Sequence, residues 1–127
     1  MKISMDHILL VVKDLDDTIN FYKFLGFKHI ETIDRPNDQV GIMKKDNMTI
    51  ELMQLPRGDE TYREPRKDSD IGFRHIGFHV DNLDEIYERL KDKIQFDGSP
   101  VHSAGRGNRK LLFFKDPDGV ELHFIQE

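Results

Sequence analysis

The chain repeats a short pattern at a constant separation, and this repeat constrains the fold more than any other feature of the sequence. An internal repeat predicts a fold built from two similar units. Each half of the 127-residue chain is too small to be stable alone, so we expect a single domain in which the halves share a core. The matched pairs, each 68 residues apart (75 − 7), are His7 with His75, Ile8 with Ile76, Val12 with Val80, Leu15 with Leu83, and Asp16 with Asp84.

Both halves show the same order of extended and helical patterns. The first half predicts a strand over 7–12, a helix over 15–25, and strands over about 28–34, 39–45 and 48–55. The second half predicts a strand over 73–80, a helix over 83–91, and extended runs over about 94–102, 109–115 and 120–126. The charged stretch 56–71, with prolines at both 56 and 65, predicts a solvated connector. We therefore expect an α+β domain over 1–127, with βαβββ modules at 1–55 and 72–127.

The last strands of the two halves can be aligned independently of the first. Residues 46–54 match residues 118–126 at a separation of 72 (118 − 46), and this alignment pairs Glu51 with His123. Side chains alternate between the two faces of a strand, so the apolar neighbours of these two residues should pack under the helices. Glu51 and His123 then face away from the helices. The same alternation predicts that His7 and His75 face away as well.

These four residues, two from each half, form a candidate metal-binding set. Neutral imidazoles and a carboxylate suit one divalent ion of nickel, zinc, cobalt, iron or manganese. The chain has no cysteine, which excludes disulfides, thiolate nucleophiles and cysteine-ligated structural zinc. The predicted metal ligands are His7, Glu51, His75 and His123.

Several fragments, in this order and spacing, resemble the vicinal oxygen chelate superfamily. This superfamily includes glyoxalase I (lactoylglutathione lyase), extradiol dioxygenases and antibiotic-resistance proteins. The resemblance covers essentially the whole chain, and it implies two βαβββ modules that form a cup around one divalent metal. The fragments are Asp6-His7-Ile8, Val12-Lys13-Asp14-Leu15, Phe21-Tyr22, Leu25-Gly26-Phe27, Ile50-Glu51-Leu52, Arg74-His75-Ile76 and Phe114-Lys115-Asp116-Pro117-Asp118-Gly119.

One ligand position departs from the bacterial glyoxalase I pattern that the resemblance implies. His7, Glu51 and His75 match the first three ligands, but His123 stands where that pattern has a glutamate that also acts as the base. Glu121 lies two residues earlier on the same predicted face, so the fourth ligand is either His123 or Glu121. The candidate catalytic residues are Glu51, Glu121 and His123.

Three further residues are candidates for substrate binding. His79 shares the predicted face of His75, although a histidine at the rim of the sheet is an equally good interpretation. Arg106 and Arg109 flank a glycine-containing loop and could clamp a carboxylate or phosphate. The simpler alternative is that they lie on a solvated hairpin.

The resemblance implies a divalent-metal-dependent enzyme of the lactoylglutathione lyase type, acting on a small substrate with vicinal oxygens through an enediolate-like intermediate. Two alternatives stay open: a non-catalytic drug- or antibiotic-binding resistance protein, and an Fe(II) extradiol dioxygenase. The resemblance also implies a homodimer. The net charge of −5 gives no reason to expect nucleic acid. No apolar run is long enough to span a membrane, and the N-terminus lacks the apolar core of a signal peptide, so we expect a cytoplasmic protein.

Overall fold

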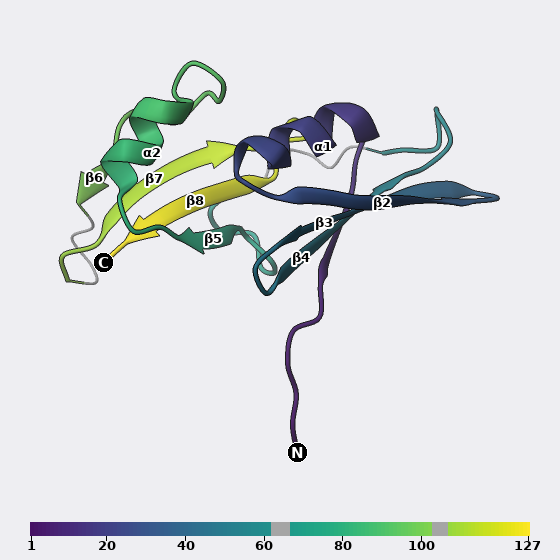
Figure 1. Ribbon diagram of the computed structural model, residues 1–127, viewed down its shortest axis with the longest axis horizontal. Coiled ribbons are helices and arrows are strands. Elements are labelled where there is room, and N and C mark those ends of the chain that lie inside the picture. Colours follow the sequence, from purple (N-terminus) through teal and green to yellow (C-terminus); the bar gives the residue numbers. More distant parts are fainter. Residues whose placement is uncertain (62–66, 103–106) are drawn as a thin grey trace. The chain divides into compact units, whose positions relative to one another are not determined.

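The computed structural model confirms the predicted α+β fold of two βαβββ units (Figure 1). It describes residues 1–61, 67–102 and 107–127. The chain divides into two compact units, Met1–Asp68 and Ser69–Glu127, which we call unit 1 and unit 2. Neither helix of the described residues has the length and apolar character needed to cross a membrane.

Unit 1 contains one helix on a four-stranded mixed sheet. In the sheet order β1-β4-β3-β2, β1 runs parallel to β4 and the other neighbours are antiparallel. Helix α1 lies across one face of this sheet (Figure 1). The elements are β1 (Ile8–Val11), α1 (Leu15–Phe24), β2 (Lys28–Arg35), β3 (Asp38–Lys45) and β4 (Met48–Gln54).

Local sequence signals explain the bounds of α1. The side chain of Asp14 accepts a hydrogen bond from the backbone N–H of Asp17, as an N-cap residue does. Gly26, with φ of 95°, follows the last turn and adopts a conformation that glycine tolerates best. The helix buries Leu15, Thr18, Ile19 and Tyr22, and β4 buries Ile50 and Leu52. The prediction that these two strand residues pack inward is therefore confirmed.

Unit 2 repeats this arrangement with the sheet order β5-β8-β7-β6. Strand β5 is parallel to β8, and α2 packs on β7 and β8. The core includes the fully buried side chains of Leu83, Leu112, Phe114 and Leu122. The elements are β5 (Ile76–His79), α2 (Leu83–Leu90), β6 (Val101–His102), β7 (Lys110–Lys115) and β8 (Glu121–Gln126).

Two predicted strands of unit 2 are too long. The run predicted over 94–102 contains only β6, Val101–His102, and one isolated bridge between Phe96 and Phe114. Gly98 has φ of 87°, which turns the backbone out of the extended conformation between these two points. The strand predicted over 73–80 pairs only at Ile76–His79, because its partner β8 begins at Glu121.

The strand register confirms both separations on which the repeat depends. Leu9 lies beside Glu51 in unit 1, and Gly77 lies beside His123 in unit 2. Leu9 and Gly77 are 68 residues apart (77 − 9), whereas Glu51 and His123 are 72 residues apart (123 − 51). The two halves therefore superimpose strand for strand in sequence register.

A glutamine ends the last strand of each unit, and the structure shows why the two match. The side-chain carbonyl Oε1 of Gln54 accepts a hydrogen bond of 2.6 Å from the backbone N–H of Leu15. The equivalent Oε1 of Gln126 accepts one of 2.7 Å from the N–H of Leu83. Each glutamine therefore satisfies a backbone donor in the first turn of the helix, where no intrahelical partner exists.

Candidate metal-binding site

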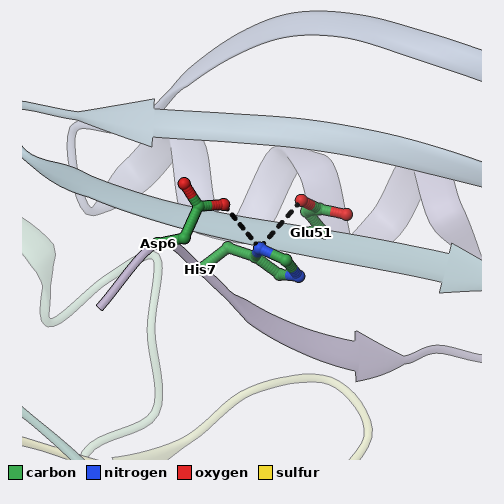
Figure 2. Close-up of side chains that lie close together, drawn as sticks. All are labelled: Asp6, His7 and Glu51. Carbon is green, nitrogen blue, oxygen red and sulfur yellow. Dashed lines mark hydrogen bonds and ion pairs between the residues drawn. The ribbon is translucent and has the colours of Figure 1, made fainter. Parts of the chain in front are cut away.

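In unit 1, a histidine and two carboxylates converge just before and beside β1 (Figure 2). The Nδ1 atom of His7 lies 2.8 Å from Asp6 Oδ2 and 3.4 Å from Glu51 Oε2. Glu51 lies on β4 between the buried residues Ile50 and Leu52, so the strand alternation directs its side chain to the opposite face. The hydrogen bond from Asp6, with the nearby charge of Glu51, raises the pKa of His7 above its ordinary value.

In unit 2, the equivalent histidine approaches a different carboxylate. His75 Nδ1 lies 3.3 Å from Glu121 Oε1, a distance close to that between His7 and Glu51. Ile76 lies beside Leu122 in the parallel register, so continuing the register by one residue puts His75 beside Glu121. No bulge or shift of register is needed for this approach.

His123 lies between aromatic rings and is 8% exposed. Its ring stacks on Phe113, with 4.8 Å between centroids and 24° between planes, and lies 4.3 Å from the ring of His75. Burial, followed by the nearby charge of His75, lowers the pKa of His123. Its Nδ1 atom is buried and has no hydrogen-bond partner among the described residues. The neutral imidazole is therefore strongly favoured at this position.

Gly77 provides the space that the His123 ring occupies. A Cβ atom built on Gly77 would lie 2.6 Å from His123 Nε2 and 3.0 Å from its Cδ2, far inside van der Waals contact. The equivalent residue in unit 1 is Leu9, beside Glu51. A side chain is therefore accommodated opposite the flexible glutamate but would collide with the rigid imidazole.

Two of the predicted substrate-binding residues contact a carboxylate of unit 2 itself. Glu127 Oε1 lies 2.5 Å from a guanidinium nitrogen of Arg109 and 3.4 Å from His79 Nε2. These two neighbours lower the pKa of Glu127, with the Arg109 hydrogen bond as the larger cause. The third predicted residue, Arg106, lies outside the described residues.

The donors of each unit suit a divalent metal. Unit 1 presents one imidazole and two carboxylates whose donor atoms all lie within 4.8 Å of one another. Unit 2 presents two imidazoles and one carboxylate, from His75, His123 and Glu121. Imidazole nitrogen and carboxylate oxygen are the donors that nickel, zinc, cobalt, iron and manganese share.

Sequence reasoning missed three participants. Asp6 stands next to a predicted ligand, and only its position before the strand could have pointed to it. Gly77 and Phe113 surround His123, but pairing across strands is what brings them there. A glycine in the middle of a short apolar strand was the available signal for a close approach.

Comparison with known proteins follows from this architecture. The family model described as the Glyoxalase/Bleomycin resistance protein/Dioxygenase superfamily matches residues 4–124. The chain belongs to this superfamily. Its characteristic pair of βαβββ units is therefore the fold described above, and the candidate donors lie within the matched region.

Several members of the superfamily are similar along nearly the whole chain. The lactoylglutathione lyase of Neisseria meningitidis is 30% identical, over 95% of this chain and 88% of that protein. The uncharacterized protein YwkD of Bacillus subtilis is 27% identical, over 98% of this chain and 97% of that protein. A glyoxalase family protein from Enterococcus faecalis superimposes with a TM-score of 0.82 at 25% identity, over 96% of each chain. The fosfomycin resistance protein FosX of Listeria monocytogenes, solved with Mn(II) and sulfate, has a TM-score of 0.71 over 100% of this chain and 94% of that chain; at 19% identity it shows only the shared fold.

Proposed function

We propose that this protein is a divalent-metal-dependent enzyme of the lactoylglutathione lyase type, acting on a small substrate with two neighbouring oxygens. The observation that carries the proposal is a matched pair of contacts: each unit has a histidine Nδ1 within 3.3–3.4 Å of a glutamate on the same face of its sheet. Relatives of 28–30% identity that carry the name lactoylglutathione lyase support the choice of reaction.

The proposed metal ligands are His7 and Glu51 from unit 1, with His75 and either His123 or Glu121 from unit 2. Among these residues, Glu121 is the carboxylate that the sequence pattern did not place as a ligand, and its contact with His75 supports its inclusion. Once bound, a divalent metal supplies Lewis-acid polarisation of substrate oxygens.

Glu121 is the proposed base. Its side chain is 28% exposed, so it can reach a substrate, and its hydrogen-bonding neighbour His75 orients it. A carboxylate in this position would take a proton from one substrate carbon and return it to the neighbouring carbon. His123 is a poorer choice because its Nδ1 is buried and its ring is held against Phe113.

Two measurements test the proposal. Elemental analysis should find a stoichiometric divalent metal after purification without chelator, and lactoylglutathione turnover should be detected by the absorbance of its thioester. Glu121→Gln should lower kcat by a factor on the order of 10² or more while metal remains bound. A protein that binds no metal and gains no thermal stability on addition of nickel or zinc would refute the proposal.

An Fe(II) extradiol dioxygenase is the second candidate, because that site needs two histidines and one late carboxylate. The contact between His75 and Glu121 favours it, since it offers a carboxylate without any shift of register. Oxygen uptake with catechols and ferrous iron, in the absence of lactoylglutathione turnover, would support this candidate. Tight binding of small molecules with neither activity would instead favour a binding protein of the same fold.

We also propose a homodimer, as the resemblance to the superfamily implies. Sedimentation equilibrium of the full chain over a range of concentrations measures the oligomeric state. A mass of one chain at micromolar concentration would contradict this part of the proposal.

A further inference from the structure

Asp6 lies outside the four-ligand set, yet it makes the shortest contact of any group with His7. Its Oδ2 atom is 2.8 Å from His7 Nδ1, while Glu51 Oε2 is 3.4 Å from the same nitrogen. Both carboxylates therefore point at one ring atom (Figure 2). All three residues belong to unit 1, so their arrangement does not depend on unit 2.

The separations match those between ligands of one metal ion. Ligand atoms about 2.1 Å from a metal lie about 3.0 Å apart at neighbouring octahedral positions and about 3.4 Å apart in a tetrahedron. The two observed N–O distances of 2.8 Å and 3.4 Å are close to these values. One imidazole with two carboxylates also supplies two negative charges, which suits a divalent cation.

A hydrogen-bonding role for Asp6 explains the geometry less well. In that role Asp6 would accept the Nδ1–H and leave Nε2 to bind the metal. Figure 2 shows the second ring nitrogen of His7 on the edge that points away from both carboxylates. An ion bound at Nε2 would therefore lie on the side away from Glu51, although Glu51 is one of the proposed ligands.

We propose that Asp6 is a metal ligand, and that Asp6, His7 and Glu51 form a divalent metal site contained within unit 1. This inference rests on the proposed function for two of its ligands and adds a third. The exposed fractions of the side chains, 93% for Asp6, 39% for His7 and 23% for Glu51, leave the remaining coordination positions open. Donors from unit 2 or from a substrate can fill those positions.

The test uses the full chain, freed of metal with chelator and titrated with Co²⁺. Calorimetry gives the affinity and stoichiometry, and the visible absorption of bound cobalt reports the coordination. Asp6→Asn should weaken cobalt binding at least about tenfold and change the visible spectrum, because it removes a charged ligand without changing side-chain size. Asp16→Asn, which removes an equally exposed charge from unit 1, should leave the affinity within about twofold of the wild-type value.

A second variant separates the two units. His75→Ala combined with Glu121→Gln and His123→Ala removes the donors of unit 2, and this protein should still bind one cobalt ion per chain with reduced affinity. Adding Asp6→Asn to it should abolish binding. Circular dichroism of each variant confirms that the fold is retained.

The outcomes distinguish this inference from the proposed function. If Asp6→Asn binds cobalt like the wild-type protein while His7→Ala does not, Asp6 is no ligand and the inference fails, but the proposed function stands. If the variant without unit 2 donors binds no cobalt, the self-contained site is wrong. If the wild-type chain binds no metal, both proposals fail.

Discussion

The two units place the same histidine in different surroundings, and the difference lies in a single step along one strand. In unit 1 the glutamate stands beside Leu9, diagonal to His7; in unit 2 that position holds His123, and the glutamate moves two residues toward the start of the strand. Each histidine nevertheless ends within 3.4 Å of a carboxylate. A duplicated scaffold can therefore keep a contact while exchanging the residue that provides it.

The exchange has a structural consequence in the neighbouring strand. A histidine ring is rigid and flat, and His123 lies over Gly77 and against Phe113. Unit 1 needs no such space, and its equivalent residue is the half-exposed Leu9. The glycine and the histidine of unit 2 thus depend on each other, which the following substitutions test in order of expected effect.

Gly77→Ala should destabilise the protein by about 1–3 kcal/mol, because the new Cβ overlaps the His123 ring. The matched substitution in unit 1, Leu9→Ala, should cost less than about 1 kcal/mol, since Leu9 is 41% exposed. Urea unfolding of the metal-free protein measures both values. Equal costs at the two positions would show that His123 moves aside freely, and the proposed dependence would then be wrong.

Gln54→Leu and Gln126→Leu should have similar costs, of about 1–2 kcal/mol each. Both substitutions keep the bulk of the side chain but leave a partly buried backbone N–H, of Leu15 or Leu83, without its acceptor. Unfolding experiments on the two single variants provide the comparison. A loss confined to one variant would mean that the equal geometry of the two contacts hides unequal energetics.

His123→Leu should stabilise the metal-free protein by about 1 kcal/mol. The substitution removes a buried Nδ1 that has no partner among the described residues and leaves an apolar side chain against Phe113. His7→Leu, at the partly exposed equivalent in unit 1, should change stability by less than about 0.5 kcal/mol. The free energy of unfolding decides: a marked loss in His123→Leu would reveal a hydrogen bond to Nδ1.

The two histidines should also titrate in opposite directions from the ordinary value of 6.5. The pKa of His7 is raised, so its contribution to stability is complete below pH 6.5 and is lost as the pH rises through the folded-state pKa. The pKa of His123 is lowered, so its contribution is complete above pH 6.5 and is lost as the pH falls through the folded-state pKa.

NMR titration of the imidazole Cε1–H resonances in chelator-treated protein checks this pair of shifts. The His7→Gln and His123→Gln variants assign the two signals. Two identical titration curves near pH 6.5 would show that burial and the neighbouring carboxylates do not distinguish the sites.

The amino-acid sequence was enough to predict the duplication, the order of helices and strands, and the face on which each candidate residue lies. These features depend on periodicity and on turn residues, both of which are local properties of the chain. The burial of Ile50 and Leu122, and the register of Glu51 and His123, agree with that prediction. The strand over 94–102 failed because a local turn at Gly98 interrupts an otherwise extended pattern.

Tertiary structure alone decided which side chains meet. Residues on one face of a strand are about 7 Å apart, so a contact depends on strand pairing and on rotamers, neither of which periodicity specifies. Pairing brings Glu121 to His75, and packing holds His123 against Phe113. The convergence of Asp6 and Glu51 on one nitrogen of His7 arises in the same way, because it requires β1 and β4 to lie side by side.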